Sequence, residues 1–205
     1  MEKTIARIVS ILFHPLFMTT IGLLIIFNSG TYLSVLSPQV KKVSMIATIL
    51  FTVIFPASAI MILYLSKTIY DIELNERKER SIPFIISIVL YLFTFFLMRE
   101  IRQLSAGHLV YFFCPPLIIF FLLILNNWSK PSVHMAAIGM LSGVLLMLIV
   151  LFNASLQGAF ILSMIAAGLT GTARLILGKH FPLEILTGYL TGFLVAAVVI
   201  FFYAV

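Results

Sequence analysis

Three short polar patches interrupt an otherwise apolar chain of 205 residues, and the third has the residue types of a phosphoryl-transfer site. It runs from Arg174 to Glu184. Proline is favoured at the first position of a helix, so Pro182 places Glu184 third, where a carboxylate can reach back over the helix start. That carboxylate can accept a hydrogen bond from one nitrogen of His180 and leave the other nitrogen free as a nucleophile. Arg174, expected in the last helical turn before a Gly178 cap, offers a planar fork of donors for phosphate oxygens.

The second patch, Lys130 to His134, places a serine and a histidine at the start of another expected helix. Ser132 can donate its hydroxyl to a phosphate oxygen, and His134 can act as the acid that protonates a departing alkoxide. A serine at this position is equally a helix cap, and the histidine equally an interfacial residue. Both interpretations remain open at this point.

The first patch is a run of charged residues before Pro83. Such runs are usually solvated loops. Arg77 and Arg80 are three residues apart, so one helical turn would aim both side chains the same way, with Glu76 and Glu79 able to brace them. We therefore include both arginines as candidate ligands of an anion.

A proline follows or lies within each patch, at positions 83, 131 and 182. We expect these prolines to mark the starts of three helices, because the missing N–H has no partner there in any case. Helix starts present free backbone N–H groups and the positive end of the helix dipole. Three of them at one end of a bundle would form an anion site before any side chain is added.

The composition requires a membrane to position these patches. The chain is 62% hydrophobic, only 10% charged, and has a mean hydropathy of +1.18, whereas a soluble protein carries roughly a quarter charged residues. The apolar runs are continuous rather than alternating, which favours helices over a barrel. We predict an all-α polytopic membrane helix bundle, one integral domain over residues 1–205 in the cell membrane, with seven spans at about residues 5–27, 43–66, 83–98, 107–126, 133–152, 156–177 and 183–204.

With seven spans, all three patches lie on the same side of the membrane. This prediction depends on the short third span, because the first patch would lie on the opposite face if that segment did not cross the membrane. Nine Lys and Arg residues lie on the patch side and four opposite, but six of the nine belong to the candidate site, so the orientation stays open. The net charge of +6 comes without a basic stripe interleaved with aromatics, so no nucleic-acid partner is expected.

The second and third patches resemble the signature of the type 2 phosphatidic acid phosphatase superfamily, membrane lipid phosphatases related to vanadium haloperoxidases. That signature has three parts, Lys-x6-Arg-Pro, Pro-Ser-Gly-His and Ser-Arg-x5-His-x3-Asp. The spacing of the last two is intact here, in Pro131-Ser132-Val133-His134 and in Ala173-Arg174-x5-His180-x3-Glu184. The resemblance implies a core of six helices, with the first span as an addition.

The resemblance also implies a role for each candidate residue. His180 would be the nucleophile that forms a phosphohistidine, Glu184 its orienting acid and His134 the general acid. Arg174 and Ser132 would bind the phosphate.

The chain departs from the family pattern at several positions. Glu184 stands in place of Asp, which keeps the chemistry and lengthens the arm. Val133 replaces Gly and Ala173 replaces Ser, which removes backbone freedom and a hydroxyl. No Lys stands seven residues before Arg80, and we take Arg77 and Arg80 as the substitutes for the first motif.

These residues predict metal-independent hydrolysis of a lipid phosphate or diphosphate, with no cofactor. Asp71 is the only aspartate, so a magnesium-dependent, aspartate-rich transferase is not expected. An intramembrane serine protease is not expected either, because the segment from Gly139 to Gly143 misses the Gly-x-Ser-Gly element and suits close helix packing. The alternative is a membrane transporter or lipid-binding protein that holds an anionic substrate without cleaving it.

Two further histidines have no assigned role. His14 lies about two turns below the patch side in the first span, and either approaches the site or only accompanies a kink at Pro15. His108 has no evident partner, and we expect it at a membrane interface.

Overall fold

Residues 1–204, which a computed structural model describes, form nine α-helices and no strand. Three short turns of other helical types, η1 to η3, join or extend them. The elements are α1 (Glu2–Leu12), α2 (Pro15–Phe27), η1 (Tyr32–Ser34), α3 (Pro38–Ile49), η2 (Leu50–Ile54), α4 (Phe55–Leu65), η3 (Arg77–Arg80), α5 (Ser81–Arg99), α6 (Ala106–Leu125), α7 (Val133–Phe152), α8 (Gln157–Ile176) and α9 (Pro182–Ala204).

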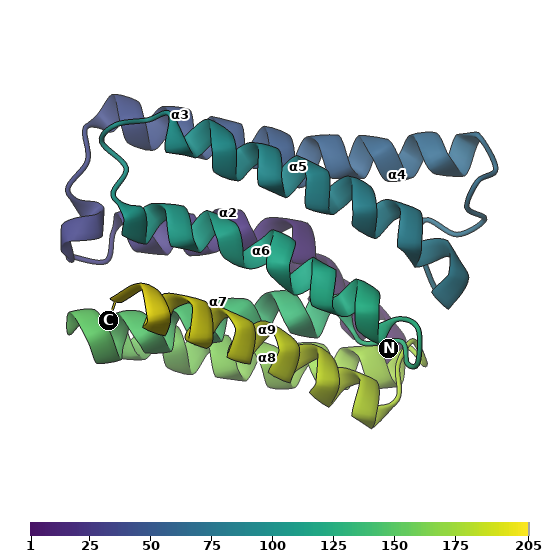
Figure 1. The fold of residues 1–205 in the computed structure, drawn as a ribbon. Helices are drawn as coiled ribbons and strands as arrows, with labels where there is room; N and C mark the ends of the chain where they lie inside the picture. Colours follow the sequence, from purple (N-terminus) through teal and green to yellow (C-terminus); the bar gives the residue numbers. More distant parts are fainter. Residues whose placement is uncertain (205) are drawn as a thin grey trace.

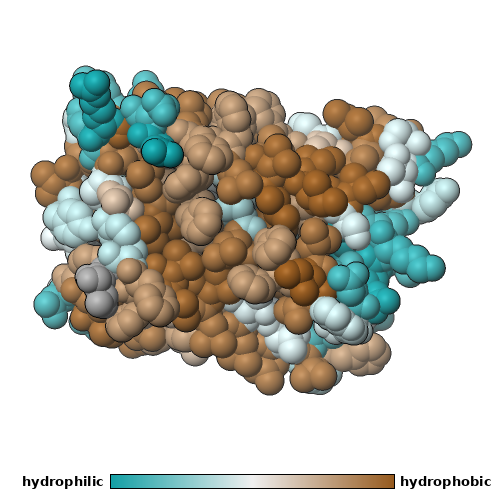
Figure 2. Space-filling model, viewed as in Figure 1, coloured by the Kyte–Doolittle hydropathy of each residue, from teal (hydrophilic) through white to brown (hydrophobic). Residues whose placement is uncertain are grey.

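Six helical segments within residues 1–204 are long and apolar enough to cross a membrane. The pair α1 and α2, bent by 52° at a short break, makes a seventh if it is counted as one span. The predicted polytopic helix bundle is therefore confirmed, and its third span, α5, is 19 residues long rather than short. Figure 2 shows an apolar band between two polar ends, as expected for a protein surrounded by lipid.

The second span is a continuous helix with a local defect. A π-helical turn, η2, joins α3 to α4 just before Pro56. Proline has no N–H and its ring clashes with the carbonyl four residues back, so widening the helix at this point accommodates it.

The helices form a layered bundle. Figure 1 shows α3, α4 and α5 along one side, α2 and α6 in the middle, and α7, α8 and α9 along the other side. α7 packs most closely against α9 and also contacts α2 and α8, while α1 lies against α8. α7 is largely buried and forms the centre of this second half.

Glycines bring α7 and α9 into backbone contact. A Cβ added to Gly192 would overlap the carbonyl oxygen of Ala136, and one added to Gly188 would overlap backbone atoms of Ser132. The close packing predicted for the segment from Gly139 to Gly143 is confirmed as well, because a Cβ added to either glycine would overlap a backbone oxygen of α9. The close contact fixes the start of α9 against the start of α7, where two of the polar patches meet.

The three polar patches lie at the same end of the bundle, as predicted. The loops that join α4 to α5, α6 to α7 and α8 to α9 are all at the right-hand end in Figure 1. The loops at the other end join α2 to α3, α5 to α6 and α7 to α8.

Candidate functional site

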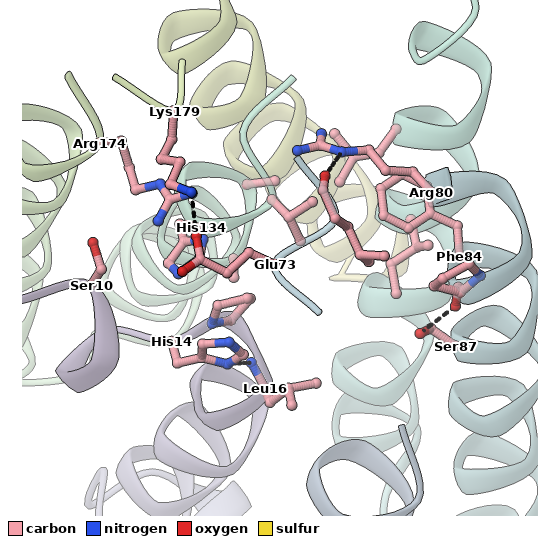
Figure 3. Close-up of a pocket in the computed structure, with 18 of the residues that line it drawn as sticks. Ser10, His14, Leu16, Glu73, Arg80, Phe84, Ser87, His134, Arg174 and Lys179 are labelled. Carbon is pink, nitrogen blue, oxygen red and sulfur yellow. Dashed lines mark hydrogen bonds and ion pairs between the residues drawn. The ribbon is translucent and has the colours of Figure 1, made fainter. Parts of the chain in front are cut away.

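The first patch forms η3 and separates its two arginines. Arg80 is buried, and it donates from Nε to the carbonyl oxygen of Leu74 at 2.9 Å and from Nη1 to that of Pro131 at 3.0 Å (Figure 3). Arg77 is exposed, and its backbone oxygen accepts a bond from Asn126 Nδ2 at 2.9 Å. The prediction that one turn aims both arginines the same way is wrong, because only Arg80 turns inward to bridge two loops.

The second patch begins α7. Ser132 is its N-cap, with Oγ accepting the N–H of Met135 at 3.4 Å, while the backbone N–H of Ser132 donates to the carbonyl oxygen of Glu184 at 2.9 Å. The Ser132 side chain is completely buried by these contacts. The structure thus gives Ser132 the capping role that the sequence left open. His134 is the second residue of α7 and is half-buried.

The third patch begins with the predicted tight loop after α8. Gly178 has a φ of +65°, a left-handed conformation that favours glycine. Its N–H donates to the carbonyl oxygen of Leu175 at 2.9 Å, and the N–H of Lys179 donates to that of Arg174 at 3.1 Å. This pair of bonds is a Schellman cap, and it ends α8 at Ile176, two residues after Arg174.

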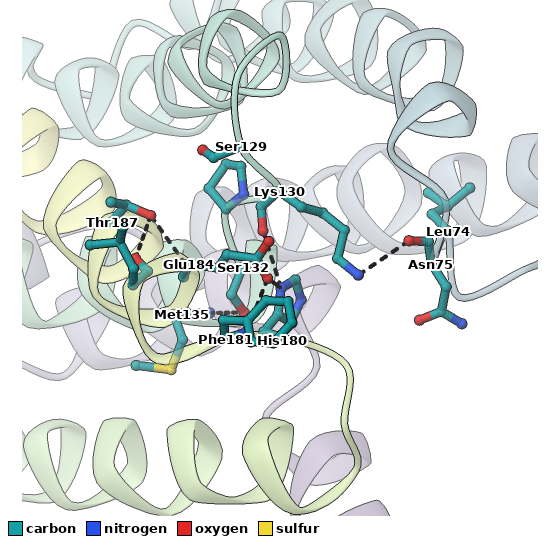
Figure 4. A network of polar contacts seen from close by, with 12 residues as sticks. Leu74, Asn75, Ser129, Lys130, Ser132, Met135, His180, Phe181, Glu184 and Thr187 are labelled. Carbon is teal, nitrogen blue, oxygen red and sulfur yellow. Dashed lines mark hydrogen bonds and ion pairs between the residues drawn. The ribbon is translucent and has the colours of Figure 1, made fainter.

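The loop then delivers His180 to the start of α9. As predicted, Pro182 is the first helical residue and Glu184 the third, and Glu184 Oε2 accepts the N–H of Phe181 at 3.1 Å. The same oxygen lies 3.1 Å from His180 Nδ1, and the carbonyl oxygen of Lys130 lies 3.1 Å from it as well (Figure 4). Since both neighbours are acceptors, Nδ1 carries the proton and Nε2 keeps its lone pair.

The electrostatic surroundings keep His180 neutral. Burial lowers its pKa to about 4, with the positive charge of Arg80 as the next cause, although the bond to Glu184 opposes this. Burial and the charge of Arg80 also lower the pKa of Lys130 in the neighbouring loop. At neutral pH the His180 imidazole is therefore an uncharged base with one unprotonated nitrogen.

Residues from all three patches meet in one cavity of about 650 Å³. His180, His134, Arg174 and Arg80 all line it, although they are spread over 101 residues of sequence. Glu184 stands behind His180 and does not line the cavity, and neither do Ser132 and Arg77. The structure thus brings together both predicted histidines and two of the predicted arginines.

Arg174 is a buried polar group of the cavity that lacks a partner. Its side chain is 6% exposed, and its buried Nε has no hydrogen-bond partner among residues 1–204. Neither of the ion pairs found in that part of the chain includes it. A buried Nε–H without a partner destabilises a protein, so its presence in the cavity wall indicates that the guanidinium meets a ligand.

The loop between α4 and η3 lines the charged end of the cavity, here called its mouth, and was not predicted to take part. Glu73 and Leu74 line the cavity, and Glu73 Oε2 forms an ion pair with Lys179 Nζ at 2.8 Å (Figure 3). Asp71 shapes this loop by accepting the N–H groups of Glu73 at 2.9 Å and Asn75 at 3.3 Å. Burial opposes the ionisation of Asp71, but these bonds outweigh it and lower its pKa.

The cavity continues below the charged mouth into the bundle. Its deeper wall is apolar and comes from α2, α5, α6 and α7, with Tyr91 among the deepest lining residues on α5. Tyr91 lies eleven residues beyond Arg80, which corresponds to about 16 Å along a helix, or roughly half the thickness of a hydrocarbon core. The cavity therefore has room for an apolar tail beneath a charged headgroup.

The first span also contributes to the cavity. Lys3, Arg7, Ser10 and His14 all line it. Spacings of four and three residues place Lys3, Arg7 and Ser10 on one face of α1, a pattern that is visible in the sequence. His108 is buried near the start of α6 at the opposite end of the bundle, and the partner that the sequence did not reveal is the carbonyl oxygen of Leu33, 2.7 Å from Nε2.

Comparisons with protein-family models, curated proteins and solved structures gave no match to this chain. Its function must therefore be inferred from the geometry of the cavity. Three features carry that inference: a neutral imidazole with one free nitrogen, buried arginines at the mouth, and an apolar extension into the bundle.

Proposed function

We propose that the protein is a lipid phosphate phosphatase of the type 2 phosphatidic acid phosphatase superfamily, acting in the cell membrane without a metal or cofactor. The observation that carries this proposal is the pairing, in one cavity, of a neutral His180 with an unpartnered Arg174. The first is arranged as a nucleophile and the second as an anion ligand.

The substrate that fits is a phosphate or diphosphate ester of a membrane lipid. Its phosphate lies at the mouth, where Arg174 donates through its whole guanidinium group and Arg80 through the nitrogen not bound to a loop carbonyl. Its tail lies in the apolar part of the cavity. A headgroup at the mouth and a tail within one leaflet suit a substrate that never leaves the bilayer.

In the first step, Nε2 of His180 attacks phosphorus, and the bond from phosphorus to the ester oxygen breaks. His134 donates its proton to that departing oxygen, which leaves as an alcohol or a phosphate. The phosphorylated imidazole is cationic, and Glu184 stabilises it through the bond to Nδ1–H. The two arginines stabilise the charge on the equatorial oxygens in the transition state.

In the second step, water attacks phosphorus on the phosphohistidine. His134, now unprotonated, accepts a proton from the water as the bond from Nε2 to phosphorus breaks. Inorganic phosphate is released, and both histidines return to their starting protonation states.

The test is formation of the covalent intermediate. Purified protein in detergent with a chelator is mixed with radiolabelled 4-nitrophenyl phosphate and quenched in alkali, in which phosphohistidine survives. The unaltered protein should carry label on His180, and His180→Asn should carry none. His134→Asn should accumulate more label, because a good leaving group needs no acid whereas hydrolysis of the intermediate still needs a base.

The same experiment decides against the non-enzymatic alternative. A carrier or lipid-binding protein would bind dodecyl phosphate, release no inorganic phosphate and take up no label in any variant. Label that persists in His180→Asn would instead show that another residue is the nucleophile and would overturn the proposal.

A further inference from the structure

The break between α1 and α2 places a third histidine in the cavity. His14 precedes Pro15, and a residue before proline is disfavoured in the α conformation, so the helix stops here and restarts. The two helices meet at an angle of 52°. His14 lies at the inside of this bend, in the wall of the cavity rather than toward lipid.

The ring of His14 lies against the ring of His134. Their centroids are 5.3 Å apart and the planes meet at 79°, so one imidazole presents its edge to the face of the other. Phe17 makes a second edge contact to His14, with centroids 6.1 Å apart. His14 is thus held on one side by its own helix and touches His134 from the other side.

The hydrogen bonding of His14 leaves one nitrogen available. Nδ1 accepts the backbone N–H of Leu16 at 3.4 Å, so in the neutral ring the proton is on Nε2. This bond caps α2. However, it is long, and asparagine, aspartate and serine are the preferred capping residues, so capping alone does not explain a histidine here.

The first span is anchored to the two helices that carry the site. α1 packs against α8, whose last turn contains Arg174, and α2 packs against α7, which begins next to His134. The polar face of α1 points into the same cavity, and Ser10 on it is buried with an unpartnered hydroxyl. A helix that only anchored the chain in lipid would not place its polar residues there.

We propose that His14 is a positioning residue for the general acid of the reaction. This inference rests on the proposed function. The perpendicular contact with the His14 ring fixes the ring plane of His134, and the proton of His134 therefore points at the oxygen that leaves phosphorus. His14 itself neither bonds to the substrate phosphorus nor exchanges a proton with the substrate.

Two variants separate positioning from capping. His14→Phe keeps an aromatic ring against His134 and removes the cap, whereas His14→Asn keeps a cap and removes the ring. Each is assayed with dodecyl phosphate, whose alkoxide leaves poorly, and with 4-nitrophenyl phosphate, whose leaving group needs no acid. His134→Ala serves as the reference for complete loss of the acid.

The expected signature is a leaving-group dependence. His134→Ala should lose about 10² to 10⁴ on dodecyl phosphate in kcat/KM, which reports the first step alone, and the loss should be at least tenfold smaller on 4-nitrophenyl phosphate. His14→Asn should lose about tenfold on dodecyl phosphate and less than about twofold on 4-nitrophenyl phosphate, and His14→Phe should recover most of the loss. Adding His14→Asn to His134→Ala should cause no further loss.

Other outcomes overturn the inference. If His14→Asn, which keeps the cap, is fully active and His14→Phe, which removes it, loses activity equally on both substrates, then His14 only caps α2. Equal losses on both substrates in both variants, or additivity with His134→Ala, likewise rule out an action through His134. Release of phosphate from neither substrate by the unaltered protein rejects the proposed function and this inference together, whereas the preceding outcomes reject the inference alone.

Discussion

Replacing Arg174 with methionine should stabilise the protein and abolish its activity. The side chain is 6% exposed and its Nε has no partner among residues 1–204. An unsatisfied buried donor lowers stability by about 1 to 3 kcal/mol, and more when it is charged. Methionine has a similar length, fills the same volume and makes no demand for a partner.

For a chain of this size, a gain of 1 to 3 kcal/mol corresponds to a rise in melting temperature of roughly 2 to 12 °C. The phosphate would lose about two charge-assisted hydrogen bonds of about 1.5 to 3 kcal/mol each, so kcat/KM should fall by about 10² to 10⁴. The assay is thermal unfolding in detergent, together with phosphate release from dodecyl phosphate. Arg102→Met, at an exposed arginine near the opposite end, is the matched control and should change neither quantity.

A second measurement links the two effects. Inorganic phosphate at about 100 times its dissociation constant should raise the stability of the unaltered protein by about 2.7 kcal/mol and should leave Arg174→Met unchanged. If Arg174→Met melts below the unaltered protein, the guanidinium has a structural partner and the argument from its missing hydrogen bond is refuted. Full stabilisation of Arg174→Met by phosphate would refute its role as a ligand.

Three further predictions follow from the contacts around the cavity. Glu73→Gln breaks the 2.8 Å ion pair with Lys179 at the mouth. Because such partly exposed pairs contribute about 0 to 1 kcal/mol, KM should fall by up to about fivefold with kcat unchanged. A higher KM would contradict the idea that the Glu73 carboxylate competes with the substrate phosphate for Lys179. The melting temperature should fall as the pH drops from about 7 to about 4.5, because burial and then a neighbouring guanidinium lower the folded pKa of His180 from 6.5 to about 4, so the unfolded chain is protonated first. His180→Asn should flatten that fall, and equal slopes in both proteins would argue against the shift. Gly192→Ala should destabilise the bundle by about 1 to 3 kcal/mol because its Cβ overlaps a carbonyl oxygen of α7, whereas the control Gly168→Ala, with no atom within 4 Å, should melt no lower than the unaltered protein.

Local rules predicted the third patch because its geometry is set by residues close in sequence. Pro182 fixed the first position of α9, and the spacing to Glu184 then decided which carboxylate braces His180. Gly178 likewise predicted the loop, because the left-handed conformation that ends a helix favours glycine. Each of these contacts spans at most a few residues, so no knowledge of the packing was required.

The unpredicted parts depend on contacts between distant segments. A serine at a helix start fits both a cap and a phosphate ligand, and only the burial of Ser132 against α9 decides for the cap. Glu73 reaches the site because Asp71 shapes the loop between α4 and η3, to which both residues belong. No spacing in the sequence relates Glu73 to Lys179. Arg77 was misplaced because the exposure of each arginine depends on the loops that Arg80 bridges.

The distribution of hydrogen bonds between the two buried arginines suggests how the site divides its tasks. Arg80 donates two hydrogen bonds to loop carbonyl oxygens and so fixes the relative positions of the first and second patches. The Nε–H of Arg174 has no acceptor among residues 1–204, and Glu73 pairs with Lys179 rather than with Arg174. Arg80 therefore holds the loops of the cavity together, whereas Arg174 is free to bind the substrate. Exchanging each for lysine should separate these tasks, because lysine lacks the planar fork: Arg80→Lys should lower stability and kcat together, whereas Arg174→Lys should raise KM in a protein that is at least as stable.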